Sequence, residues 1–399
     1  MILRSGYPFW LIKEGLLYKF PKLNKNIESE IFIVGGGISG ALMRYYLIEA
    51  RINCVLVDSR AIGLGSTCAS KALLQYEINT PLSELINLIG QSKAERSYTL
   101  CNEAILTLEK MANKIGFCEF QRKKSLYYAA YKKDVAFLKK EFEARKKTGF
   151  NIDYLDEKAM TEQFGFDAPK AIFSKHGGQT NAYVFAHALL QYQKEEKFAV
   201  CFGTVLTKVE HQKKVATIET EERFTIKTNK IIYANGYQAF QIINKNILNL
   251  KSTYAVIREQ YNRAEFRKDN VVILNTAKPY LYLRTTLDGR ILVGGRDEDC
   301  YNPKKRDRLI VSKAKQLVSD FNKIYFNIKF KAAFCWTATF GQTKDGLPIT
   351  GAYDKIPSSY FGLGIRNSDI TFSVIAAKII TDLMLGNENS DAMIFGFDR

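Results

Sequence analysis

The chain has few residues of the kinds that build metal centres and nucleophilic active sites. Only three of its 399 residues are histidine, and they are far apart at His176, His187 and His211. The seven cysteines are scattered, and no two are spaced as Cys-x-x-Cys. We therefore expect no metal site and no Ser-His-Asp triad. The odd number of unclustered cysteines favours a reducing compartment.

Long apolar runs are missing too. No stretch of about 20 apolar residues could cross a bilayer, and Lys13 and Glu14 interrupt the N-terminal aromatic patch, unlike a signal peptide. The sequence predicts a cytoplasmic protein without a membrane span. Its net charge of +17 can attract polyanions, but no basic stripe is interleaved with aromatic residues. We interpret the charge as solvated lysine-rich faces and do not expect a nucleic-acid partner.

The most informative stretch runs from 31 to 40, where an apolar, β-branched segment enters a glycine turn that opens a helix. Gly35 allows a tight turn, Gly37 lets the backbone approach a pyrophosphate, and Gly40 lets the helix pack on the strand. A second apolar strand ends in Asp58, 18 residues after Gly40, close to the ~20 at which an acid meets a ribose hydroxyl. This pattern favours a dinucleotide-binding βαβ unit over a plain glycine turn, and it fits NAD or FAD.

Two further regions suggest how the rest of the chain is used. Residues 61–70 are small and hydroxyl-bearing, which suits contact with a phosphate or ribityl chain but also a surface loop. Residues 254–295 alternate like strands and are rich in tyrosine, with Asp288-Gly289 as a hairpin signal. They predict a second, antiparallel module.

Several separate segments, in order, resemble the D-amino-acid oxidase family of FAD-dependent amine oxidoreductases, the group that includes glycine oxidase and sarcosine oxidase. The resemblance covers nearly the whole chain. Its segments are the Gly35 turn, Gly65-Ser66-Thr67 with Ala69-Ser70, Gly177-Gly178, Ala234-Asn235-Gly236, Tyr282-Leu283-Arg284 before the 288–294 hairpin, Trp336, 345–351 and 370–373.

This resemblance implies an α/β protein, α+β overall. A Rossmann-like FAD-binding domain with a parallel central sheet would join a substrate domain built on an antiparallel sheet flanked by helices. The FAD-binding domain would be discontinuous, formed by residues 1–91, 174–245 and 332–399. Residues 92–173 and 246–331 would form the substrate-binding domain.

The resemblance also implies that FAD is bound non-covalently. The glycines and helix start would hold the pyrophosphate, Asp58 the adenosine ribose, and the hydroxyl loop the phosphate and ribityl region, while Val205 would meet adenine through its backbone. The full set of expected cofactor-binding residues is Gly35, Gly37, Ile38, Ser39, Gly40, Asp58, Ser59, Ser66, Thr67, Ser70, Val205, Ala234, Asn235, Gly236, Gly341, Asp345, Gly364, Ser368, Asp369, Ile370 and Thr371.

The substrate-side candidates carried by the same resemblance are Arg284, Tyr282, Tyr254, Arg366 and Gln75. Tyr282 and Arg284 share a strand face, and an aromatic wall with one cation suits an amine that carries a carboxylate. Phe340 stands where glycine oxidase has its carboxylate-binding arginine, so Arg366, Arg284 or Arg258 would have to replace it. Asp369, in a segment where the family has a glycine-rich approach to the last helix, is interpreted as a helix cap.

The function that follows is oxidation of the C–N bond of an amino acid or related small amine to an imine, by hydride transfer to flavin N5. The electron acceptor is either O₂ or an electron carrier, because the oxygen-activating lysine of sarcosine oxidases is not evident in Ile291-Leu292-Val293. Two alternatives stay open. The chain could act on a modified tRNA base with FAD, or it could bind a flavin without turnover.

Overall fold

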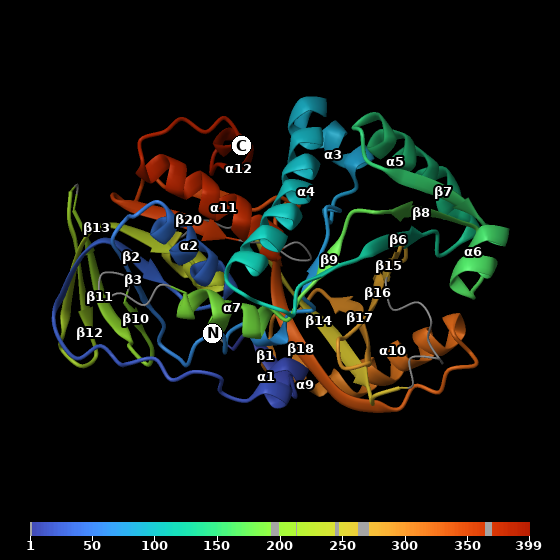
Figure 1. Ribbon diagram of the computed structural model, residues 1–399, viewed down its shortest axis with the longest axis horizontal. Helices are drawn as coiled ribbons and strands as arrows, with labels where there is room; N and C mark the ends of the chain where they lie inside the picture. The colour runs from blue at the N-terminus through green and yellow to red at the C-terminus, as the bar shows by residue number, and fades with distance from the viewer. Residues whose placement is uncertain (1, 193–198, 213, 244–246, 262–270, 364–368) are drawn as a thin grey trace.

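Two large sheets organise the computed structural model, which describes residues 2–192, 199–212, 214–243, 247–261, 271–363 and 369–399. Among the described residues, one sheet has eight strands and the other has nine. A third, smaller sheet has three strands. Figure 1 shows the first sheet with its helices on the left and the second on the right. The predicted class, a mixed α/β fold with a Rossmann-like unit, is confirmed.

The eight-stranded sheet is built around β2 (Ile27–Val34), which pairs in parallel with β3 (Cys54–Val57) and β13 (Thr225–Tyr233). These central strands are apolar because both of their faces are covered. The sheet is completed by β10 (Val200–Cys201), β11 (Leu206–His211), β12 (Ala216–Thr220), β19 (Ile349–Ala352) and β20 (Ser359–Leu363).

Helices α2 (Ile38–Glu49) and α11 (Asp369–Met384) pack against each other on one face of this sheet (Figure 1). The long α4 (Gln91–Lys114) packs on α11, and α7 (Ala182–Gln191) packs on α2. The buried Arg44 fastens that last contact, because its Nη1 donates to the carbonyl oxygen of Tyr192 at 2.9 Å. The helix that follows β2 and the last long helix, distant in sequence, therefore lie side by side.

The nine-stranded sheet has the strand order β1-β18-β14-β17-β16-β15-β6-β8-β7. The predicted hairpin is present, since β16 and β17 pair antiparallel and Gly289 lies in the left-handed region at φ +73°. The strands are β1 (Arg4–Gly6), β18 (Ala332–Gln342), β14 (Asn249–Arg258), β17 (Ile291–Glu298), β16 (Leu281–Thr285), β15 (Val271–Asn275), β6 (Lys124–Tyr128), β8 (Lys170–Ser174) and β7 (Ile152–Asp156).

Shorter elements surround these sheets. The three-stranded sheet has the order β4 (Leu73–Leu74), β9 (Gly178–Gln179) and β5 (Gln121–Arg122). The other helices are α1 (Phe9–Glu14), α3 (Leu82–Ile89), α5 (Val135–Lys147), α6 (Glu157–Phe164), α8 (Phe240–Ile243), α9 (Pro303–Arg308), α10 (Ile310–Ile324) and α12 (Ala392–Phe395), and short 3-10 turns include η1 (Thr67–Ala69) and η4 (Gly236–Ala239).

A buried ionic cluster joins α5 to the start of α3. Arg145 donates from Nε to Glu141 at 2.7 Å, and its Nη1 lies 3.5 Å from Glu77 Oε1. Glu141 in turn accepts from the backbone amides of Leu82 and Ser83, each at 2.9 Å. Burial by itself raises the pKa of Glu141, but Arg145 and the two amides outweigh it and hold the pKa below its usual value. Because every charge in the cluster is paired, its burial is tolerated.

The structure adds detail to the predicted division into domains. Strands β1 and β18 belong to segments assigned to the FAD-binding domain, yet they pair with each other and β18 pairs with β14 in the nine-stranded sheet. The chain therefore passes between the two sheets through β18. The domain boundaries themselves stay predictions.

Candidate functional site: a dinucleotide cavity with an adjoining aromatic pocket

The glycine turn after β2 has the geometry that its sequence predicts. Gly35 has φ +112°, and a Cβ there would lie 2.8 Å from the carbonyl oxygen of Ala234. At Gly40 a Cβ would lie 1.8 Å from the carbonyl oxygen of Gly35, so only glycine permits this close packing of helix on strand. At Gly37 a Cβ would come within 2.9 Å of Thr67 Oγ1. The turn thus brings the N-terminus of α2 close to the end of the sheet, where its amides form an anion site.

Asp58 holds this turn as well as facing the cavity. Its Oδ2 accepts from the backbone amide of Gly36 and its Oδ1 from that of Arg60, both at 2.8 Å. Burial raises the pKa of the carboxyl group, while the two amides and the Arg60 guanidinium oppose that shift. A carboxylate offers about four lone-pair directions, so these two bonds are compatible with a further bond to a ribose hydroxyl.

The hydroxyl loop closes over the helix start. Thr67 Oγ1 accepts from the amide of Ile38 at 3.0 Å, which satisfies one of the amides at the start of α2. Ser39 Oγ lies 2.7 Å from Ser373 Oγ and so joins α2 to α11. Of the two readings that the sequence left open for residues 61–70, the structure favours the one at the site, because Ser66, Thr67 and Ser70 line the cavity.

The cavity has a volume of about 740 Å³ and lies beside the turn. Asn235 contributes a buried Oδ1 that has no hydrogen-bond partner among the described residues. Such an atom is an acceptor kept for a ligand or a water. Fourteen of the expected cofactor residues line this cavity, namely Gly35, Gly37, Ile38, Ser39, Asp58, Ser59, Ser66, Thr67, Ser70, Val205, Ala234, Asn235, Gly236 and Ile370.

Three other expected cofactor residues, Gly341, Asp345 and Thr371, are not among the residues that line the cavity. At Gly341 a Cβ would meet Tyr237 at 2.9 Å, so this glycine makes room for a side chain that does line the cavity. Asp345 binds Arg399 at 2.7 Å and the amide of Leu347 at 3.0 Å. Thr371 is fully buried.

Part of the expected set lies beyond what the structure shows. Gly364, Arg366 and Ser368 are outside the described residues. Asp369 begins α11, but its side chain is also outside them, so its interpretation as a helix cap stays a prediction.

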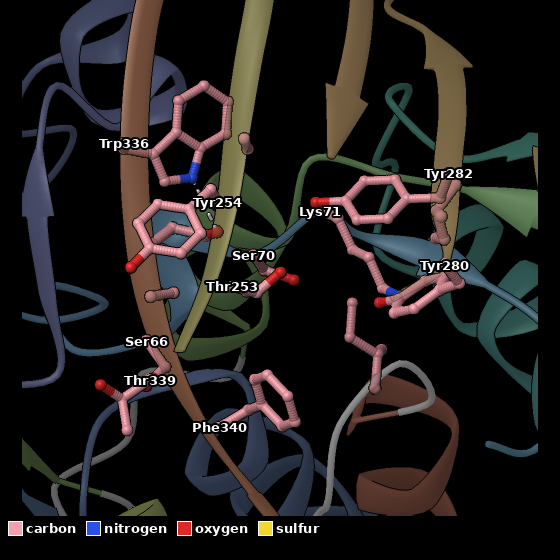
Figure 2. Close-up of a pocket in the computed structure, with 15 residues that line it drawn as sticks. Ser66, Ser70, Lys71, Thr253, Tyr254, Tyr280, Tyr282, Trp336, Thr339 and Phe340 are labelled. Carbon is pink, nitrogen blue, oxygen red and sulfur yellow. Dashed lines mark hydrogen bonds between the residues drawn. The ribbon is translucent and has the colours of Figure 1, made fainter. Parts of the chain in front are cut away.

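A smaller pocket of about 70 Å³ adjoins the cavity (Figure 2). Ser66, Ser70 and Ile370 line both spaces, so the two open on the same point. Tyr254 and Tyr282, both expected on the substrate side, line the pocket and are 1% and 3% exposed. Burial raises the pKa of each phenol, so both stay protonated at neutral pH.

Arg284, the cation expected beside these tyrosines, lies behind the pocket and is absent from its lining. Its Nη1 donates to the carbonyl oxygens of Ala72 and Thr180 at 2.9 and 3.0 Å, and its guanidinium stacks 4.7 Å from the Trp10 ring centre. Burial lowers its pKa. This arginine supports backbone, so the structure does not favour direct contact with a substrate.

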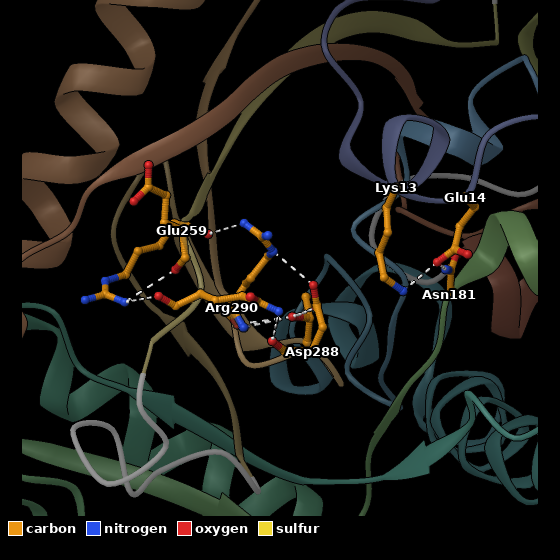
Figure 3. Close-up of polar contacts among 9 residues, drawn as sticks. Lys13, Glu14, Asn181, Glu259, Asp288 and Arg290 are labelled. Atoms are coloured by element: carbon orange, nitrogen blue, oxygen red, sulfur yellow. Dashed lines mark hydrogen bonds and ion pairs between the residues drawn. The ribbon is translucent and has the colours of Figure 1, made fainter.

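Helix α1, near the N-terminus, contacts the loop that lines the pocket. Trp10 Nε1 donates to the carbonyl oxygen of Ser70 at 2.8 Å. Figure 3 shows Glu14, at the end of α1, between Lys13 at 2.6 Å and Asn181 Nδ2 at 3.4 Å. The same view shows the pairing of Arg290 with Asp288 at the β16–β17 turn, at 2.9 Å. The N-terminal segment therefore packs on the body of the protein.

Gln75 is fully buried and does not line the pocket. Neither its Oε1 nor its Nε2 has a hydrogen-bond partner among the described residues. Its substrate-side role stays a prediction.

Among the pocket residues that sequence reasoning missed are Lys71, Tyr280 and Thr253. Tyr280 could have been found, because it shares the alternation of Tyr282 and Arg284 on one strand face. Lys71 follows the hydroxyl loop directly, but no local pattern distinguishes it from the many solvated lysines.

Taken together, the glycine turn, the acid after the second strand, the unpartnered Asn235 oxygen and the cavity of about 740 Å³ fit a dinucleotide cofactor. These features define a dinucleotide-binding protein. The aromatic pocket opens on the same cavity at Ser66, Ser70 and Ile370.

Comparison with known proteins identifies the family. The model of the FAD-dependent oxidoreductase family (DAO) matches residues 30–383. Gamma-glutamylputrescine oxidoreductase of Escherichia coli (strain K12) is 21% identical over 384 residues, which cover 94% of this chain and 88% of that protein.

Solved structures show the same fold. Glycine oxidase from Geobacillus kaustophilus matches with a TM-score of 0.78 and 16% identity, over 94% of this chain and 99% of that one. L-amino acid deaminase from Proteus vulgaris matches with a TM-score of 0.78 and 15% identity, over 96% and 100%.

The chain belongs to the DAO family of FAD-dependent oxidoreductases. The resemblance seen in the sequence is thereby confirmed, as are its enzymatic class and its cofactor, FAD. Which residues contact FAD stays a prediction, supported by the cavity that they line. Within the described residues, no helix is long and apolar enough to cross a membrane; the cytoplasmic location stays a prediction.

Proposed function

We propose that this protein oxidises the C–N bond of an amino acid or related small amine to an imine. The observation that carries the proposal is the aromatic pocket that adjoins the cofactor cavity at Ser66, Ser70 and Ile370. A related protein is named a gamma-glutamylputrescine oxidoreductase, and proteins of the same fold are named glycine oxidase and L-amino acid deaminase. When bound, FAD supplies the two-electron acceptor for a hydride from the carbon next to nitrogen.

The walls of the pocket align the substrate and exclude water. Trp336 is fixed by a 3.0 Å bond from Nε1 to the carbonyl oxygen of Ala69, and Phe340 lines the pocket at the end where Ser66 and Thr339 lie (Figure 2). Thr253, also in the lining, has an Oγ1 without a hydrogen-bond partner among the described residues. This hydroxyl is suited to accept an N–H of the substrate amine. Alignment of this kind provides much of the rate in such reactions.

The proton balance follows from the lining. The substrate loses a hydride and a proton when its C–N single bond becomes a C=N bond. None of the described residues that line the pocket is aspartate, glutamate or histidine. The amine therefore loses its extra proton to solvent before the hydride leaves, and the rate rises with pH through the pKa of the substrate amine.

Anaerobic mixing of the FAD-loaded protein with a panel of amino acids and small amines tests the proposal. Loss of the oxidised flavin absorbance with at least one member, and a rate that rises with pH, are expected. A flavin that no member of the panel reduces would contradict amine oxidation and favour binding without turnover. Readmission of oxygen then separates the two acceptors, because an oxidase recovers its absorbance without an added carrier.

The Thr253→Val variant is the matched structural test, because valine keeps the shape and removes only the hydroxyl. We expect slower flavin reduction with little change in FAD content. Loss of one uncharged hydrogen bond predicts about a 2- to 10-fold effect.

A further inference from the structure

Lys71 is the charged side chain among the described residues that line the pocket. Its Nζ lies 4.7 Å from the ring centre of Tyr282 and 5.5 Å from that of Tyr280, and 3.5 Å from Tyr280 Oη. Figure 2 shows this group on one side of the pocket, opposite Trp336 and Tyr254. Ring faces attract an ammonium, so the two tyrosines hold the cation at the pocket instead of letting it extend into solvent.

The backbone around Lys71 is fixed on both sides. The carbonyl oxygens of Ala69, Ser70 and Ala72 accept, respectively, from Trp336, Trp10 and Arg284 at 3.0, 2.8 and 2.9 Å. All three donors are buried.

A strained backbone completes this support. Ala72 has φ +49°, a left-handed conformation that a residue with a Cβ adopts only when its surroundings hold it there. Ser70 Oγ accepts from the amide of Ala72 at 3.0 Å. Such over-determination of a short loop is typical of a preorganised binding site.

The sheet leaves space for the ring of Tyr282, over which Lys71 lies. At Gly294, on the neighbouring strand β17, a Cβ would lie 2.1 Å from Tyr282 Oη. Any side chain there would displace the ring. Gly294 is therefore the residue that lets Tyr282 lie flat across the strand and face Lys71.

We propose that Lys71 binds the carboxylate of the substrate, and that this protein therefore prefers small amino acids to amines without a carboxylate. The inference rests on the proposed function and adds the class of substrate to it. A carboxylate bound to an ammonium makes charge-assisted hydrogen bonds, roughly twice as strong as neutral ones. A second ammonium on a diamine would instead be repelled by Lys71. Arg284 is a positioning residue in this scheme, because it acts through the carbonyl of Ala72.

Calorimetric titration of the FAD-loaded protein with sodium propionate tests the anion site without any turnover. Propionate has the carbon skeleton and the carboxylate of a small amino acid, and propionamide is its uncharged control. We expect propionate to bind the wild type and propionamide not to bind measurably. In Lys71→Met the affinity for propionate should fall about 10- to 100-fold, the range for loss of a hydrogen bond between charged groups.

Three variants keep the test decisive. Lys71→Arg keeps the charge and should restore most of the affinity. Lys71→Gln keeps a polar chain without charge and should behave like methionine, and it serves if the methionine variant loses FAD. Lys158→Met is the matched surface control, since this lysine is 83% exposed on α6, and it should leave propionate binding unchanged. Unchanged propionate binding in both uncharged variants, or no binding to the wild type, would overturn the proposal.

Anaerobic reduction by alanine and by isopropylamine separates this inference from the proposed function. We expect alanine to be preferred by the wild type and the preference to collapse in Lys71→Met. Reduction by both compounds with an unchanged preference would refute the role of Lys71 and leave amine oxidation intact. If propionate binds and the binding depends on Lys71, but no amine reduces the flavin, the anion site is supported and amine oxidation is refuted.

Discussion

Replacing Asp58 by alanine tests whether this carboxylate holds the glycine turn as well as the cofactor. The buried amide of Gly36 would lose its acceptor at 2.8 Å, and a buried donor left without a partner costs about 1–3 kcal/mol. The amide of Arg60 can bind water because that residue is partly exposed. Removal of a carboxyl group whose pKa burial raises offsets part of the loss. We expect a decrease of about 1–2 kcal/mol in the free energy of unfolding of the FAD-free protein.

Urea unfolding of FAD-free protein measures that decrease, and quenching of flavin fluorescence measures the dissociation constant of FAD. Because the predicted contact between Asp58 and the ribose would also be lost, FAD affinity should fall about 10- to 100-fold. Asp58→Asn is the matched control, since its amide oxygen can still accept from Gly36, and it should lose less stability. If Asp58→Ala weakens FAD binding but leaves the unfolding midpoint of FAD-free protein unchanged, the carboxylate does not support the turn.

Further predictions concern packing and buried charge. Gly40→Ala should abolish or severely weaken FAD binding, because its Cβ would meet a carbonyl oxygen at 1.8 Å; spectroscopic FAD content of the purified protein checks this, and normal content would contradict it. Arg145→Met should lower the free energy of unfolding by about 3–5 kcal/mol, and added Glu141→Leu should recover part of it in urea titrations, because the cluster then holds one carboxylate without its arginine, Glu77, instead of two. Burial alone raises the pKa of Asp345, but Arg399 outweighs it and holds the pKa below its usual value. That stabilisation is present above the unfolded pKa and is lost as pH falls through the lowered folded one, so the deficit of Asp345→Asn at pH 7 should shrink in acid; a deficit independent of pH would refute the pairing.

The glycine turn beside the cavity could be predicted from the sequence because its constraints are local. A glycine that must adopt a positive φ, or lie against a carbonyl oxygen, leaves a mark at its own position, as at Gly35 and Gly40. The acid at the end of the next strand follows from the regular length of a βαβ unit.

The sequence did not show that Lys71, rather than Arg284, is the cation that lines the pocket. The positions of both side chains depend on contacts between residues far apart in the chain. Arg284 is held by carbonyls that lie 212 and 104 residues away, at Ala72 and Thr180. Strand alternation put Arg284 on the same face as Tyr282. Only the tertiary structure shows that its guanidinium is occupied by two backbone carbonyl oxygens and the Trp10 ring. The loop that carries Lys71 takes its path from Trp10 and Trp336, which no periodicity connects to it.

One short loop takes part in both spaces of the site. Thr67 closes the helix start beside the cavity, Ser66 and Ser70 line cavity and pocket alike, and Lys71 belongs to the pocket. Ligands in the two spaces would contact the same loop, so each can change the affinity for the other, and the factor is the same in both directions. Where FAD strengthens the binding of a carboxylate, a small acid strengthens the retention of FAD by that same factor and slows its loss during dilution or heating.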